Sequence, residues 1–247
     1  PLAARPTALS VTEIEDWLRD PYTIYAKHVL RLSPLDPIDM PLSAADRGSA
    51  IHNAIGEFTQ RFPDRLPDGA ESVLLDIGRK HFAPLMDRPE ARALWWPRFL
   101  RIAAWFAGWE QARREGISHV LAEKRGEMSI PLGERPFRLS ARADRIEQHE
   151  HGAIAILDYK TGAPPTDKQV RIGLAPQLTL TAAIARAGGF EGIAPGSSVL
   201  ELTYVRVSDN TPPGEARRLE LTRDRRSDPP IPPDEAAREA REKLEGL

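Results

Sequence analysis

The sequence predicts an α/β protein, with a central mixed β-sheet flanked by helices and a helical region at its N-terminal end. Through residues 9–115, apolar side chains recur at the spacing of amphipathic helices. After Gly116 the pattern changes to short segments rich in apolar and β-branched residues, which is typical of strands. We therefore predict a single domain over residues 1–247, made of a helical part (about 9–115), a core (about 116–208) and a polar tail (209–247).

The helical part is predicted to begin with two short helices and to continue with three longer ones. Ser10-Val11-Thr12-Glu13 has the spacing of a capping box, in which the first and last residues bond the free amides of a helix start. Pro21 interrupts this helix, and a second short piece follows. Ser43 is placed to cap the third helix, which carries His52. The proline-containing residues 31–42 are predicted to be a loop, and further helices are predicted over 70–87 and 90–114.

The core is predicted to hold a three-stranded meander, then a helix and a fourth strand. The strands are expected over 120–130, 137–147, 153–159 and 198–207, and the helix over 175–187. Gly133-Glu134 and residues 149–152 supply the turns of the meander, and residues 163–176 form a loop. In the tail, the Pro- and Arg-rich residues 209–233 are expected to be mobile, and residues 234–246 to form a charged helix.

Composition is that of an ordinary globular protein and excludes several kinds of site. Of the 247 residues, 41% are hydrophobic and 28% are charged, which is enough for a sizeable core. The sequence holds no cysteine, so disulfides, zinc–thiolate sites and iron–sulfur clusters cannot form. No apolar run approaches the roughly 20 residues of a membrane span, and no basic-then-apolar leader is present. We expect no membrane partner and a cytoplasmic location.

The net charge and the two ends of the chain give information about possible binding partners. The formal net charge is -2, whereas free-standing nucleic-acid-binding proteins are more often clearly basic. The balance leaves room for a local basic groove, or for a partner that holds the substrate. The chain starts at Pro1 and ends in a helical stretch rich in Ala, Glu and Arg. We therefore expect it to be a piece of a longer protein.

Two carboxylates and a lysine are predicted to meet at adjoining strand ends. The apolar residues 154–157 lead into Asp158 and Lys160, and the preceding predicted strand carries Asp144 near its end. Residues two apart in a strand project from the same face, so Asp158 and Lys160 are neighbours. Converging carboxylates repel each other unless a cation lies between them. Mg²⁺ prefers oxygen ligands, and Asp144, Asp158 and the backbone carbonyl of Tyr159 supply them.

This grouping predicts metal-dependent hydrolysis of a phosphodiester. The Lys160 ammonium is placed to orient the attacking water or to stabilise charge on the phosphate. The alternative is a surface acid and a surface lysine at a strand edge, which is what most Asp-x-Lys sequences are. The apolar run before Asp158 and the second acid at Asp144 favour the metal site. Four basic side chains are candidates for contacting phosphates, each with a solvated surface charge as its alternative: Arg142, Arg145, Lys168 and Arg171.

Taken together, the motifs resemble the PD-(D/E)XK nuclease superfamily, in its RecB-like branch. The Asp158-Tyr159-Lys160 segment and Asp144 match the motif that names the superfamily. The resemblance covers roughly residues 9–207, and its other matching segments are 9–15, 21–30, 48–53 and 176–180. Each segment is weak alone, but their joint order is specific. The resemblance implies a restriction-endonuclease-like core and a nuclease that uses Mg²⁺, with Mn²⁺ as the alternative ion.

The resemblance also implies roles for residues outside the Asp-x-Lys segment. His52 lies where RecB-like nucleases have a metal-ligating histidine, although a lone helical histidine is more often an interior hydrogen-bonding residue. Gln177 falls in the glutamine motif of the family, which places it against the lysine, a metal-bound water or a phosphate. Glu123 is a candidate outer ligand, with a solvated strand-edge glutamate as the alternative. Thr181 stands where relatives often have a tyrosine, so no aromatic stacking is expected there.

Within that branch, the motifs most resemble the AddB family of helicase–nuclease subunits. The resemblance implies DNA as substrate, an AddA-like helicase–nuclease subunit as partner, and exonuclease processing of double-strand ends for recombinational repair. Many relatives have Cys-Pro where this chain has Asp20-Pro21, and use that cysteine for an iron–sulfur cluster, which is excluded here. The alternative is a catalytically silent domain of the same fold that binds DNA or serves as a scaffold. The joint presence of His52, Asp144, Asp158 and Lys160 favours an active nuclease.

Overall fold

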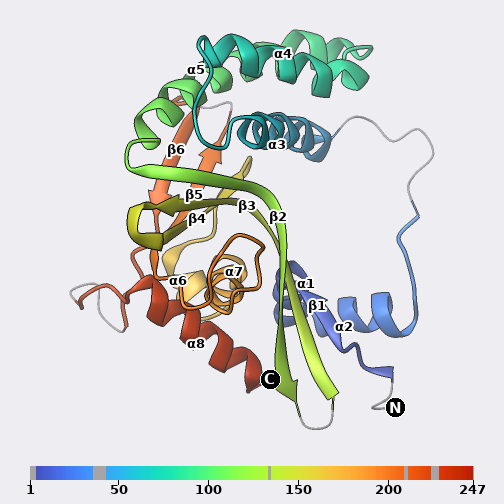
Figure 1. Ribbon diagram of the computed structural model, residues 1–247. Coiled ribbons are helices and arrows are strands. Elements are labelled where there is room, and N and C mark those ends of the chain that lie inside the picture. The colour runs from blue at the N-terminus through green and yellow to red at the C-terminus, as the bar shows by residue number, and fades with distance from the viewer. Residues whose placement is uncertain (1–3, 36–42, 133–134, 209–210, 224–227, 247) are drawn as a thin grey trace.

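A six-stranded mixed sheet forms the centre of the protein, and helices cover both of its faces (Figure 1). The computed structural model describes residues 4–35, 43–132, 135–208, 211–223 and 228–246. The strands are β1 (Ala8–Ser10), β2 (Ile117–Leu132), β3 (Arg135–His149), β4 (Ile154–Lys160), β5 (Val199–Val207) and β6 (Gly214–Arg218). This architecture confirms the predicted α/β class with a mixed sheet and an N-terminal helical region.

The sheet is built around the predicted meander. Its order is β1-β3-β4-β5-β6, and β2 pairs with β3. Strands β2, β3 and β4 are antiparallel neighbours, and β5 runs parallel to β4. β1 pairs in parallel with residues 138–140 of β3, and β6 pairs antiparallel with β5. β4 lies between β3 and β5, but its pairing with β3 ends at Leu157, so its carboxyl end, with Asp158 and Lys160, pairs with β5 alone.

The helices of at least two turns are α1 (Val11–Arg19), α3 (Ala44–Arg61), α4 (Ala70–Phe82), α5 (Trp96–Arg113), α7 (Gln177–Arg186) and α8 (Pro233–Glu245). Shorter turns are α2 (Pro21–Ile24), α6 (Asp167–Arg171), the π-helical Tyr25–Val29 and Ala91–Trp95, and the 3₁₀ turns Ala83–Leu85 and Glu150–Gly152. Both predicted caps are confirmed. The Ser10 hydroxyl accepts the Glu13 N–H at 3.2 Å, and Ser43 and Asp46 form the second capping box. None of the described helices is both long and apolar enough to cross a membrane.

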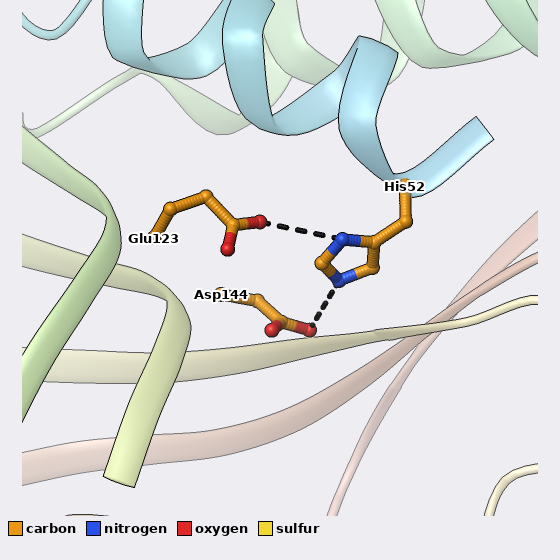
Figure 2. A group of neighbouring side chains, drawn as sticks. All are labelled: His52, Glu123 and Asp144. Atoms are coloured by element: carbon orange, nitrogen blue, oxygen red, sulfur yellow. Dashed lines mark ion pairs between the residues drawn. The ribbon is translucent and has the colours of Figure 1, made fainter. Parts of the chain in front are cut away.

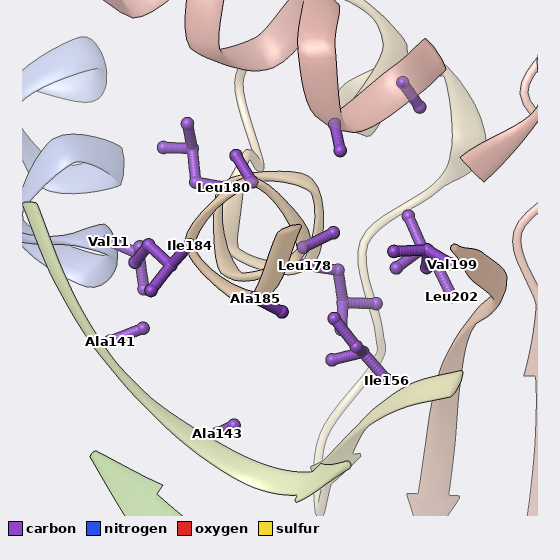
Figure 3. Close-up of a cluster of buried hydrophobic side chains, with 14 of the residues drawn as sticks. Val11, Ala141, Ala143, Ile156, Leu178, Leu180, Ile184, Ala185, Val199 and Leu202 are labelled. Atoms are coloured by element: carbon purple, nitrogen blue, oxygen red, sulfur yellow. The ribbon is translucent and has the colours of Figure 1, made fainter. Parts of the chain in front are cut away.

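Each face of the sheet has its own hydrophobic core. Helices α1, α7 and α8 pack on one face over side chains such as Ala141, Ile156 and Leu202 (Figure 3). Helices α3, α4 and α5 pack on the other face, over Leu157 and Val205. The functional strands β3 and β4 lie between the two cores. Their backbones are therefore held from both sides.

β6 and α6 lie where a mobile segment and a loop are predicted, and β1 lies where no strand is predicted. β1 is only three residues long, too short for a periodic pattern, and α6 lies within the predicted loop 163–176. The prediction that residues 209–233 are mobile is wrong for β6. Gly214 makes that strand possible, because a Cβ there would lie 2.2 Å from the ring of Trp105. Gly133-Glu134, residues 36–42 and parts of the tail (209–210 and 224–227) lie outside the described residues.

The β2–β3 hairpin bends sharply at Glu123 and Asp144. On β3, Leu139, Ala143 and Ile146 all face the core that lies under α7. Side chains on one face of a strand normally lie an even number of residues apart. Ala143 and Ile146 lie three apart, so the alternation shifts by one residue beside Asp144. On β2 the same slip separates Leu121 from Met128. Glu123 has a φ of +54°, a left-handed conformation that is unusual for a residue with a side chain. The bend turns Glu123 and Asp144 toward α3, and the hairpin continues beyond it as a long arm (Figure 1).

Arg145 is a structural residue, and its predicted role as a phosphate contact is wrong. Its side chain is 0% exposed, with Nη1 2.8 Å from the Glu110 carboxylate and Nε 2.7 Å from that of Glu147. Arg113, the last residue of α5, and Arg114, which follows it, complete the cluster. The slip in alternation beside Asp144 explains the difference, because it turns Arg145 inward toward α5 instead of outward.

Replacing Arg145 by methionine is expected to lower the free energy of unfolding by about 3 kcal/mol, because Glu110 and Glu147 then stay buried with less compensating charge. Arg138→Met is the matched control on the same strand. Its side chain is 63% exposed and lies 3.9 Å from Glu127, so its replacement should change stability by less than about 0.5 kcal/mol. Chemical denaturation measures both values. Equal, small losses in the two variants would contradict the structural role of Arg145.

Candidate functional site

Helix α3 brings His52 onto the bend of the sheet, and two glycines allow the close approach. Gly48 and Gly56 each lie four residues from His52, so all three face the sheet. A Cβ on Gly56 would lie 2.8 Å from Oε1 of Glu123, and one on Gly48 would lie 2.8 Å from Oγ1 of Thr161. Larger residues at either position would push the helix, and His52 with it, away from the strands.

His52, Glu123 and Asp144 form one cluster of possible metal ligands (Figure 2). Nε2 of His52 lies 3.1 Å from Oδ2 of Asp144, and Nδ1 lies 3.3 Å from Oε1 of Glu123. Each residue offers one ligand atom, and these atoms all lie within 4.8 Å of one another. The imidazole therefore stands between two carboxylates, with a nitrogen turned toward each.

Asp158, Lys160 and Gln177 form a second group. Asp158 and Lys160 lie at the carboxyl end of β4, and Gln177 is the first residue of α7. Nζ of Lys160 lies 2.6 Å from Oδ2 of Asp158 and donates to Oε1 of Gln177 at 2.9 Å. Nε2 of Gln177 donates to Oδ1 of Asp158 at 2.6 Å, which closes the ring of contacts. The backbone N–H of Tyr159 donates to Oδ2 of Asp144 at 2.9 Å. That bond joins the second group to the cluster.

Burial and charge repulsion shape the electrostatics of the site. The side chains of Glu123, Asp144 and Asp158 are 7%, 12% and 6% exposed. Burial, with the nearby Asp144 carboxylate, raises the pKa of Asp158 to about 7. Burial also raises the pKa of Glu123, whereas the hydrogen bond to Asp144 raises the pKa of His52. The site as it stands therefore disfavours full ionisation of its acids and favours a positive charge among them.

A buried oxygen atom indicates that a cation fits this site. Oε1 of Glu123 makes no hydrogen bond with any residue in the described part of the chain, although it lies 3.3 Å from Nδ1 of His52. Buried oxygens usually have a hydrogen-bond partner, so this one is available to a ligand. Carboxylate oxygens with one imidazole are suited to Mg²⁺ or Mn²⁺. The residues present therefore fit a divalent cation.

The structure places all the predicted site residues together, but in a different grouping from the one expected. Asp158 is not a member of the three-residue cluster, because Gln177 and Lys160 occupy its oxygens. Glu123, expected only as an outer ligand, is a member of it. The backbone conformation that turns Glu123 inward leaves no pattern in the sequence. The role of the Tyr159 carbonyl as a ligand stays a prediction.

The other predicted phosphate contacts, Arg142, Lys168 and Arg171, lie in different parts of the molecule. Nε of Arg142 lies 2.8 Å from Oε2 of Glu123, at the rim of the cluster. Arg171 and Lys168 lie on α6, on the face of the sheet that α7 and α8 cover. There Nη1 of Arg171 donates to the carbonyl of Arg223, and Lys243 of α8 donates to the Arg171 carbonyl at 2.9 Å. Arg171 thus ties the C-terminal segment to the core.

Comparison with known proteins gives one matching family. A family model described as the PD-(D/E)XK nuclease superfamily matches residues 8–247. An uncharacterized protein of Rickettsia bellii is 28% identical over 229 residues, which are 88% of this chain and 28% of that protein. Uncharacterized proteins of Rickettsia conorii and Rickettsia typhi are each 30% identical over 75% of this chain, and over 23% and 22% of their own lengths. The chain spans about a quarter of the length of these relatives.

A solved structure also matches most of the chain. The crystal structure of SSO0001 covers 96% of this chain and 86% of its own, at 12% identity and with a TM-score of 0.30. That score is too low to support an argument about fold or function.

Addition of Mg²⁺ or Mn²⁺ is expected to raise the melting temperature, because an ion that binds only the folded protein stabilises it. At an ion concentration of 100 times the dissociation constant, the gain is about 2.7 kcal/mol. Glu123→Gln should lose much of this gain. Glu127→Gln on the same strand, where the glutamate side chain is 64% exposed, should keep it. Differential scanning fluorimetry with and without EDTA measures the shifts, and a shift of the same size in both variants would place the ion elsewhere.

Proposed function

Because the chain belongs to the PD-(D/E)XK nuclease superfamily, we propose that it is a divalent-metal-dependent deoxyribonuclease domain. The observation that supports this most directly is the pairing of the two groups at the bend. His52, Glu123 and Asp144 offer metal ligands, and Asp158, Lys160 and Gln177 lie beside them. The ion is Mg²⁺ in this proposal, with Mn²⁺ able to replace it because an imidazole is among the ligands.

The proposed reaction is hydrolysis of a phosphodiester bond, which leaves a 5′-phosphate. A bound divalent ion supplies Lewis acidity and lowers the pKa of water in the site. In this proposal His52, Asp144, Asp158 and the Tyr159 carbonyl would hold the ion, together with Glu123.

Lys160 is the cationic group of the reaction in this proposal. Its side chain is 28% exposed, so the ammonium reaches the open side of the site while Asp158 and Gln177 fix its position. A fixed positive charge of this kind stabilises the negative charge that develops on the phosphate. Gln177 acts through Lys160 and Asp158, because it hydrogen-bonds both side chains and fixes their positions relative to each other.

The wider biological setting is also a proposal. The RecB-like motifs and the AddB-like order of segments suggest a cytoplasmic helicase–nuclease complex with an AddA-like partner, in which this domain degrades DNA ends as an exonuclease during recombinational repair. The chain spans about a quarter of the length of its curated relatives, so most of each relative lies outside this domain. The rival proposal is a silent domain that binds DNA without cutting it, and it predicts binding with no product at any concentration of Mg²⁺ or Mn²⁺.

Lys160→Ala and Asp158→Ala are each expected to lower the cleavage rate by about 10²–10³-fold or more, since each removes a charge that acts on the phosphate or the ion. Asp158→Ala should leave the metal-free fold intact, because the carboxylate it removes is buried and repelled by Asp144. Lys80→Ala is the control, because that lysine is 64% exposed on α4 and pairs with Glu57. Release of nucleotides from labelled DNA in Mg²⁺ gives the rates, and circular dichroism checks the fold. Cleavage by Asp158→Ala at the wild-type rate would end this assignment.

A further inference from the structure

The arm of the β2–β3 hairpin has one face in the core and one face in solvent. Beyond the bend, Leu139, Ala141 and Met128 point into the α7 core. The residues between them point to the opposite face, which is the side on which α3 and the metal-ligand cluster lie. Because β2 and β3 are in register along the arm, this outer face is a ladder of residue pairs that starts at the cluster.

Basic side chains recur along this ladder. The first pair beyond the cluster is Arg125 and Arg142, the second is Glu127 and Ser140, and the third is Ser129 and Arg138. Arg142 and Arg138 are 59% and 63% exposed, and Arg125 is also exposed. The ladder thus has three arginines and one glutamate, with Arg142 also paired to Glu123 at 2.8 Å, in a chain whose formal net charge is -2. The positive charge is local, and it leads away from the site in one direction.

The ladder ends in an open hollow. The hollow has a volume of about 460 Å³ and is lined by Thr7 and Ala8 beside β3, and by Glu127, Ser129, Pro136 and Arg138 of the arm. Arg138 lies 3.9 Å from Glu127, which is too long for a strong ion pair, so its guanidinium has donors left for another acceptor. A hollow with a basic side chain at its wall can accommodate part of a polyanion.

We propose that the outer face of the arm is a track for the backbone of a single DNA strand, with the paired Arg125 and Arg142 contacting the phosphates nearest the cleavage site and Arg138 contacting one farther along. This inference rests on the proposed nuclease function and names the form of its substrate. The rise of an antiparallel strand places the Arg125–Arg142 pair about 7 Å, and Arg138 about 20 Å, beyond Asp144. Several consecutive phosphates therefore lie within reach of one ladder.

The width of the ladder favours single-stranded DNA over a duplex. Its arginines lie on two neighbouring strands, which are about 5 Å apart, so the basic surface is one phosphate backbone wide. A duplex presents two backbones across a groove, and no matching row of basic side chains lies along the described part of β1. Contacts to phosphates alone carry no sequence information, so the track accepts strands of any sequence.

The test measures binding separately from cleavage, in protein carrying Asp158→Ala. The double variant Arg125→Ala with Arg138→Ala removes two ladder arginines. Arg79→Ala with Arg238→Ala is the control, since each of these arginines is 62% exposed and neither belongs to the ladder: Arg79 lies on α4, and Arg238 lies on α8, on the opposite face of the sheet. Binding of a fluorescent oligothymidylate of about 12 nucleotides is followed by anisotropy over a range of salt concentrations, alongside a duplex of the same length.

The track predicts that the ladder variant binds the single strand at least about tenfold more weakly at 0.1 M salt, with a salt slope lower by about 1.4, which corresponds to two lost phosphate contacts. The control variant should match its parent. Unchanged affinity and slope in the ladder variant would overturn the track, as would a parent that binds no single strand or prefers the duplex. Cleavage by the otherwise wild-type protein then distinguishes the two proposals, because loss of the track leaves the nuclease assignment intact if that protein still cuts DNA.

Discussion

The carboxylates of Glu123, Asp144 and Asp158 are held in a space where none of their side chains is more than 12% exposed. Like charges at such short range and low exposure destabilise the fold unless something compensates them. In the structure the compensation comes from His52, which stands between two of the acids, and from Lys160, which pairs with the third. The rest of the architecture serves to bring these five groups to one place.

Two backbone features make that convergence possible. The hairpin bends at the left-handed Glu123, which turns Glu123 and Asp144 to the same side of the sheet as α3. The glycines that flank His52 then let the helix lie against this bend. Strained backbone at such a position is typical of functional sites, because surrounding packing must hold it. Here the two cores on either side of the sheet provide that packing.

Much of this site could be predicted from the sequence, and the missing parts share a cause. Asp158, Lys160 and Asp144 follow from strand periodicity, and the capping boxes at Ser10 and Ser43 follow from local spacing. His52 and Gln177 could be found only through a family resemblance, because nothing in their own segments requires a ligand. The wrong prediction for Arg145 and the unpredicted inward turn of Glu123 have one cause: the alternation slips by one residue at the bend, and no feature of the composition marks it. β1 and β6 were missed because three- and five-residue strands at a sheet margin depend on tertiary packing.

The carboxamide of Gln177 has one donor end and one acceptor end, and both are in use. Its nitrogen meets the acid of Asp158 and its oxygen meets the ammonium of Lys160. A glutamate there would place a second carboxylate against Asp158 with no proton to donate, and a lysine would place a second cation against Lys160 with no atom to accept its hydrogen bond. The identities of these three positions are therefore interdependent. Over evolutionary time Asp158, Lys160 and Gln177 should be conserved together. A lineage that loses one of the three residues should soon also change the other two.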